Sequence, residues 1–222
     1  MTTTHLFWYL ARSAGFLAYL FSWGAVVLGL LMTTRLAQRI DRATQYILHR
    51  LLGLGSVAFL GIHLYTLFLD PWANFSARDL FVPFAANYRP FWMCCGILAA
   101  YLLVAIAATS IVQQRLPRVV WRSIHGLSFL TFFVGLAHGI GSGADSGQLW
   151  ARAVYAITAT VVGGLCVRRA LWEPKAANQP KKAGVPRRID PRTHALSGLL
   201  ATPAAGQHDE NTTLADGTCR TR

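Results

Sequence analysis

The chain has 222 residues, of which 54% are hydrophobic and 14% are charged, and its formal net charge is +12. Long apolar runs in so weakly charged a chain exclude an ordinary soluble globular domain and predict an integral membrane protein. The positive charge does not indicate nucleic-acid binding, because membrane proteins concentrate Lys and Arg in their cytoplasmic loops. We therefore expect membrane lipid, and no nucleic acid, among the partners.

Five segments are long and apolar enough to cross a bilayer as helices. They are residues 8–32, 46–69, 91–112, 119–140 and 151–171. The predicted fold class is all-α, an integral membrane helical bundle of about five transmembrane helices. The first segment is too long for a cleaved signal peptide and lacks a basic cluster before it, so we expect it to be retained.

The distribution of basic residues predicts the orientation of the bundle. Lys and Arg gather at residues 35–42, 115–122 and 168–188, whereas loops 70–90 and 141–150 are balanced or nearly uncharged. The positive-inside rule then places the N-terminus outside and the C-terminus in the cytoplasm. We expect a multi-pass protein of the cell membrane, in a bacterial inner membrane.

Two of the predicted spans carry two histidines each. His49 and His63 are 14 residues apart, and His125 and His138 are 13 apart. Ionisable side chains inside a membrane are costly and usually functional. The predicted orientation places His49 and His125 at the same depth near the cytoplasmic face, and His63 and His138 at the same depth near the outer face. Because haem iron accepts one imidazole on each side of its ring, we predict that the four histidines are the metal ligands of two b-type haems. The alternative is that they form hydrogen bonds between helices.

The helical period supports one of the two spacings and complicates the other. Fourteen residues rise about 21 Å and return to within about 40° of the same face, whereas thirteen residues miss it by about 140°. His125 and His138 therefore need local overwinding, a kink, or a tilted approach to the second haem. Gly126, Gly135 and Gly139 would permit such a departure. The glycines of both histidine spans also leave room for a flat macrocycle. They are Gly53, Gly55, Gly61, Gly126, Gly135 and Gly139.

Three arginines are candidate cofactor-binding residues, because the acidic propionates of a haem need fixed cations. Arg12 would serve the outer haem, and Arg50 and Arg122 would serve the inner one. The alternative for Arg12 is snorkelling to the outer headgroups. The alternative for the other two is a role as cytoplasmic-side charges only.

The remaining segments carry less chemistry. We expect the aromatic loop 70–90 to lie on the outer interface, with a short amphipathic helix over the outer site. The span 91–112 has no buried ionisable group and is assigned to packing. Residues 173–222 have the composition of a disordered, basic cytoplasmic tail. No glycine-rich phosphate loop is evident, so a flavin is expected only through a partner.

Three stretches carry a family resemblance. They are His49-Arg-Leu-Leu-Gly-Leu54 leading to His63, Thr109-Ser110 closing the third span, and Trp121-Arg-Ser-Ile-His125 leading to His138. With them the chain resembles the ferric reductase-like transmembrane domain. This domain is shared by NADPH oxidases, ferric reductases and the haem-binding membrane subunit of the bacterial methionine sulfoxide reductase system.

The resemblance covers about residues 8–170 and divides the chain into a haem-binding domain, 1–172, and the tail. It implies that His49 and His125 hold the inner haem and that His63 and His138 hold the outer. The family often has six spans, and its oxidases carry a flavin domain. This chain shows five spans and no flavin domain.

The expected function is that of a bis-haem b membrane cytochrome. It would pass electrons from a cytoplasmic-side donor, a separate flavoprotein or quinol, to an external acceptor such as Fe(III), dioxygen or a redox partner protein. No catalytic acid–base residues are evident, so whether this oxidoreductase subunit is itself an enzyme stays open. One alternative is a single-haem or non-catalytic subunit of a redox complex, such as a methionine sulfoxide reductase-type haem subunit. Another is a small transporter whose histidines relay protons, although few polar residues lie between them.

Overall fold

The computed structural model describes residues 5–34, 36 and 40–171, and the predicted tail lies outside the described residues. All regular structure within these ranges is helical. The helices are α1 (Leu6–Thr33), α2 (Arg42–Leu69), α3 (Ala77–Phe81), α4 (Pro90–Ile111), α5 (Arg118–Gly126), α6 (Ser128–Ser142) and α7 (Leu149–Leu171), with a 3-10 turn at Gln113–Arg115. Five segments are long and apolar enough to cross a membrane, with α5 and α6 together forming the fourth. The predicted all-α membrane bundle is confirmed.

Large apolar side chains lie exposed along the spanning helices. Tyr65 of α2 is 64% exposed, Ile111 of α4 68% and Ile157 of α7 61%. A soluble protein rarely leaves so much apolar surface in contact with water. These side chains are suited to the hydrocarbon of a bilayer, so the chain is a multi-pass membrane protein.

Side-chain caps set the start of two helices. The Asp41 carboxylate accepts the Thr44 backbone N–H at 2.9 Å, so α2 begins four residues before the predicted span. Hydrogen bonding to Thr44 also lowers the pKa of the Asp41 carboxyl below its ordinary value. In the 70–90 loop, Ser76 and Asp79 form a capping box that starts α3, the short helix expected there.

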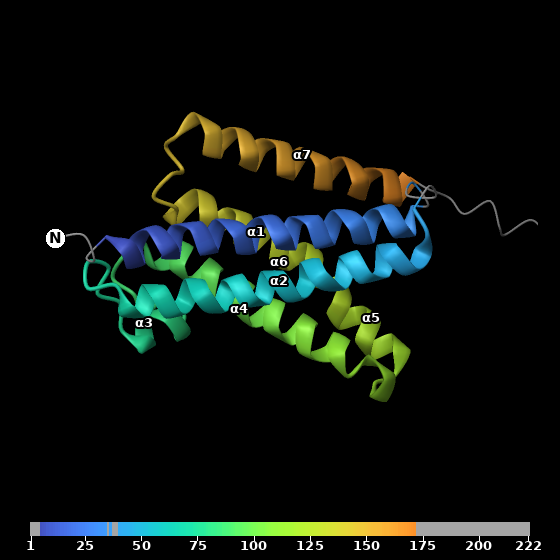
Figure 1. Cartoon of the computed structure of the whole chain (residues 1–222), viewed down its shortest axis with the longest axis horizontal. Helices are drawn as coiled ribbons and strands as arrows, with labels where there is room; N and C mark the ends of the chain where they lie inside the picture. Colours follow the sequence, from blue (N-terminus) through green and yellow to red (C-terminus); the bar gives the residue numbers. More distant parts are fainter. Residues whose placement is uncertain (1–4, 35, 37–39, 172–222) are drawn as a thin grey trace, which may run out of the picture. The chain divides into compact units, whose positions relative to one another are not determined.

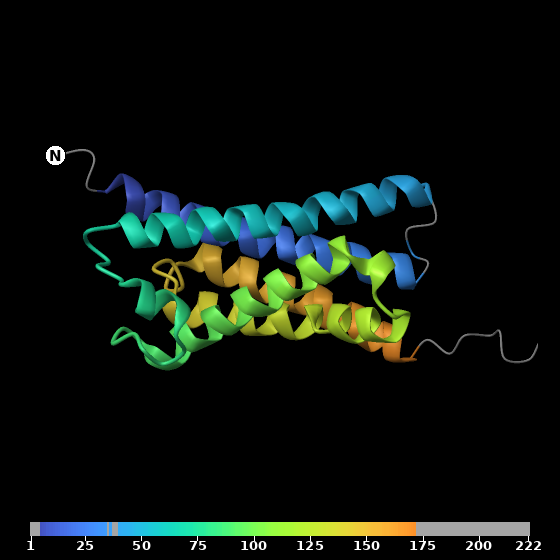
Figure 2. The same ribbon diagram turned by 90° about the horizontal axis from the view of Figure 1, so that it is seen from below.

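The spanning helices form two hairpins. In the first, α1 packs along α2; in the second, α4 packs against α5 and α6 (Figure 1). The same pairs lie side by side in the turned view of Figure 2, with α7 next to α1 and α6. Direct contact between α2 and α4 is sparse. The buried apolar core therefore lies among α1, α6 and α7, and it comprises Val26, Leu30, Phe132, Leu136, Ala151, Tyr155 and Val162.

The fourth span is broken at Leu127, between α5 and α6. The Leu127 N–H donates to the Ile124 carbonyl at 3.0 Å, three residues back instead of four. Such a bond tightens the chain locally, as in a 3-10 helix. The break lies between His125 and His138, so the departure from a regular helix that their spacing predicts is confirmed.

Candidate functional site

The four histidines of the spans form two pairs, and each pair takes one histidine from each hairpin. His49 of α2 faces His125 of α5, with ring centroids 5.9 Å apart and ring planes at 61°. His63 of α2 lies within electrostatic range of His138 of α6. All four side chains are half-buried. The structure thus brings together the same two pairs that the sequence predicts.

Every one of these rings has an oxygen beside its Nδ1 atom. The distances are 3.0 Å from His49 to the Ala25 carbonyl, 2.7 Å from His63 to the Ala11 carbonyl, 2.8 Å from His138 to the Trp92 carbonyl, and 3.4 Å from His125 to the Ser110 hydroxyl. A carbonyl can only accept, so in three rings Nδ1 carries the proton and Nε2 keeps its lone pair. This tautomer leaves Nε2 free to bind a metal, and the bond at Nδ1 also fixes the orientation of the ring.

Three glycines make room for these rings. A Cβ at Gly96 would lie 2.6 Å from the His138 ring, one at Gly15 would lie 2.8 Å from His63, and one at Gly29 would lie 3.4 Å from His49. Each glycine follows the accepting residue by four positions, and residues four apart share a helix face.

The backing helices α1 and α4 thus supply both the acceptor and the space. Glycines were expected to make room on the histidine spans, and the third span was assigned to packing, so these contacts were not predicted. The one available signal was the placement of Gly15 and Gly29, which are as far apart as His49 and His63.

The geometry of the His49–His125 pair fits haem iron better than a free metal ion. A metal–nitrogen bond is about 2 Å and the ring centroid lies about 1 Å further, so two imidazoles on opposite sides of one metal have centroids about 6 Å apart. The 5.9 Å between His49 and His125 agrees with this value. Within the described ranges, no group of three or more His, Cys, Asp or Glu could hold a metal. Zinc usually requires at least three protein ligands, whereas haem iron requires one or two.

A second observation at the His49–His125 pair points to a ligand. The Trp121 ring stacks on His125, with centroids 5.0 Å apart. Its Nε1 atom is buried, and no acceptor for it is found among the described residues. A bound group with carboxylate oxygens would satisfy this donor.

The three candidate arginines are placed differently. Arg12 forms an ion pair with Asp145, in the connection between α6 and α7, and its guanidinium lies 4.1 Å from the centre of the Trp8 ring. It therefore ties the start of α1 to that connection, a role that the sequence analysis did not foresee. Arg50 and Arg122 are both exposed. Arg50 directly follows His49, and Arg122 lies three residues before His125.

Arg89 is a site residue that the sequence analysis missed. It has a left-handed backbone (φ 40°) immediately before Pro90, and its guanidinium donates to the Gly141 carbonyl. The Trp92 ring occupies the space where a Cβ of Gly141 would lie. These contacts hold the start of α4 against the end of α6, where the Trp92 carbonyl accepts from His138.

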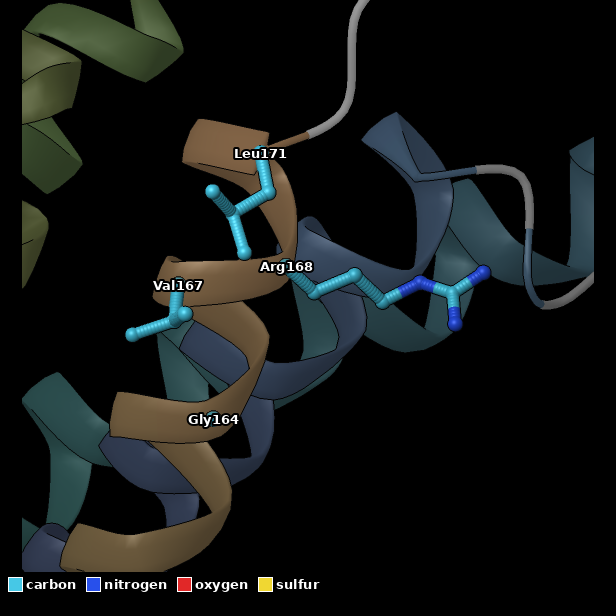
Figure 3. Close-up of a pocket in the computed structure, with 4 residues that line it drawn as sticks. All are labelled: Gly164, Val167, Arg168 and Leu171. Atoms are coloured by element: carbon cyan, nitrogen blue, oxygen red, sulfur yellow. The ribbon is translucent and has the colours of Figure 1, made fainter.

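A shallow hollow elsewhere on the surface is not part of this site. It is lined by Gly164, Val167, Arg168 and Leu171, which all belong to the last turns of α7 (Figure 3). Residues from a single helix cannot enclose a cofactor, and the paired histidines do not line the hollow.

The sequence comparison decides the family. Residues 14–136 match the family described as ferric reductase like transmembrane component. The chain belongs to this family. The match spans more than half of the chain and includes His49, His63 and His125, and His138 lies two residues beyond its end. No match was found among curated proteins or among solved structures.

Ferric reductase-like domains generally bind haem, and membership of this family indicates a role in membrane electron transfer. The pairing of histidines across the two hairpins agrees with that role. The second and fourth of the five spanning segments carry both pairs.

Proposed function

We propose that the chain is a bis-haem b membrane cytochrome. His49 and His125 would hold one haem, and His63 and His138 the other. The observation that carries the proposal is that each histidine pair comes from facing helices, with Nδ1 of each ring next to an oxygen and with Nε2 available in the three rings that donate to a carbonyl. A haem iron held by two imidazoles exchanges single electrons.

The protein's part is to hold, orient and separate the two sites. Carbonyl acceptors on α1 and α4 fix the rings, and α2 keeps its two histidines about 21 Å apart along the helix axis. Arg50 and Arg122 would meet the propionates of the haem nearer to them, together with the Trp121 N–H. A propionate role for Arg12 would require its guanidinium to be shared with Asp145.

The proposed direction of transfer rests on the distribution of basic residues together with a donor on the cytoplasmic side. The start of α2, α5 and the end of α7 lie at one end of the bundle (Figure 1), and these elements carry Arg42, Arg118 and Arg168. This end would face the cytoplasm, which puts His49 and His125 nearer the donor. Each electron lost by a separate flavoprotein or quinol would be gained by an external acceptor, so that Fe(III), for example, becomes Fe(II).

Spectra of the purified protein, with a haem-to-protein ratio, test the proposal. Two low-spin b haems per chain are expected. His49→Ala and His125→Ala should remove the same haem, and His63→Ala and His138→Ala the other. His5→Ala is the matched control, because His5 is exposed and outside both pairs.

Other outcomes would refute the proposal in distinct ways. One haem per chain would support a single-haem subunit of the methionine sulfoxide reductase type instead. A protein that takes up no haem when haem is abundant would leave a proton relay as the better explanation. Reduction of an external acceptor on addition of a donor would separate an electron-transfer subunit from a non-catalytic one.

A further inference from the structure

The acceptors for the four paired histidines follow one pattern in three cases and depart from it in the fourth. In the pattern, a carbonyl accepts from Nδ1, and the glycine four residues later faces the ring. The three instances are Ala11 with Gly15, Ala25 with Gly29, and Trp92 with Gly96. The first two instances are 14 residues apart on α1.

The same interval on α4 leads from Gly96 to Ser110. Ser110 therefore occupies the position at which a fourth glycine would face His125. Its Oγ lies 3.4 Å from His125 Nδ1, the longest of the four contacts. The carbonyl four residues earlier belongs to Ile106 and accepts the Thr109 hydroxyl at 3.1 Å. At this one ring, a side-chain hydroxyl has replaced the backbone carbonyl.

This replacement changes the ligand chemically. An acceptor at Nδ1 draws the proton away from the ring and makes Nε2 more basic, which favours the more positively charged, oxidised state of a bound metal. A hydroxyl at 3.4 Å is a weaker acceptor than a carbonyl at 2.7–3.0 Å. A hydroxyl can also rotate, whereas a carbonyl on a helix is fixed.

Resting on the haem ligation proposed above, we infer that Ser110 is the positioning residue that sets the redox potential of the His49–His125 site. Its hydroxyl accepts from His125 Nδ1 and holds the potential of this site above the value that a carbonyl acceptor would give. The His63–His138 site, with a carbonyl on both rings, is independent of Ser110.

Two substitutions at Ser110 predict shifts of opposite sign. Ser110→Ala removes the acceptor but keeps a Cβ at the position where the other three rings face a glycine, so the potential should rise. Ser110→Gly removes the Cβ as well and lets the ring donate to that carbonyl, so the potential should fall. Thr109 can release the carbonyl, because its hydroxyl also donates to Ala105 at 2.7 Å. Ser110→Thr keeps the hydroxyl and should stay close to the unsubstituted protein.

The experiment is a spectroscopic redox titration of the haem-loaded full chain and its variants. Ala108→Gly, two residues away on α4, controls for the added helix flexibility. Opposite shifts confined to the haem that His125→Ala removes would support the inference. Shifts of the same sign, or a Ser110→Gly titration equal to that of Ala108→Gly, would overturn it. An unsubstituted chain without two haem components would overturn the proposed function itself, before any Ser110 variant is compared.

Discussion

Gly96→Ala is the sharpest single test of how the histidine rings are held. The added Cβ would lie 2.6 Å from two atoms of the His138 ring, where ordinary carbon contacts are about 3.5–4.0 Å, so the ring must move by about 1 Å. The ring cannot move freely, because its Nδ1 donates to the Trp92 carbonyl at 2.8 Å. Overpacking of this kind costs about 1–3 kcal/mol. If this cost is subtracted from the binding free energy of a haem, the affinity of the site for that haem falls about 5- to 150-fold.

The assay measures how much haem each variant keeps when it is mixed with an excess of a haem-scavenging protein. The haem that His63→Ala also removes should be lost first. Gly29→Ala should have a smaller effect on the other haem, because its Cβ would lie 3.4 Å from His49. Gly164→Ala is the matched control, because nothing lies within 4 Å of its Cβ. If Gly96→Ala retains both haems as well as Gly164→Ala does, the ring does not lie against α4 as the structure has it.

Two further predictions concern stability and are measured by unfolding in detergent. Arg12→Gln and Asp145→Asn should each lower the free energy of unfolding by about 1 kcal/mol. The double variant should lower it by little more than either single variant, since each substitution removes the same ion pair. Fully additive effects would show that the two residues do not interact. Hydrogen bonding to Thr44 lowers the pKa of Asp41 in the folded chain. The Asp41 cap therefore stabilises α2 fully at pH values above the ordinary carboxyl pKa of 3.8, and this stabilisation is lost as the pH falls through the lowered pKa of the folded chain. Asp41→Ala should therefore destabilise the protein at neutral pH and have little effect in acid, and a loss that is equal at both pH values would argue against the cap.

The predicted spans agree with the structure to within a few residues because length and hydropathy are properties of the sequence alone. A departure from a regular helix between His125 and His138 was also predictable, since thirteen residues of regular helix do not present them to the same side, but its position at Leu127 was not. The start of α2 was placed too late, because its first turn is polar and Asp41 rather than hydropathy determines where it begins.

The contacts that orient the rings could not be predicted in the same way. Every residue carries a backbone carbonyl, so the residue type does not mark Ala25 or Trp92 as an acceptor, and the spacing of Gly15 and Gly29 was the only signal for the acceptor positions. The pairing of Arg12 with Asp145 was equally hidden, because it depends on how the α6–α7 connection returns to α1. Both become visible only when the helices are packed.

The hairpin arrangement has a consequence for how the protein is made. His49 and His63 are held by carbonyls of α1, and His138 by a carbonyl of α4, so each hairpin orients its own rings. A chain that enters the membrane from its N-terminus would have the first half of both sites in order before the second hairpin has been synthesised. Completion of the sites would then require the second hairpin to dock onto the first, so the order of synthesis would also be the order of assembly.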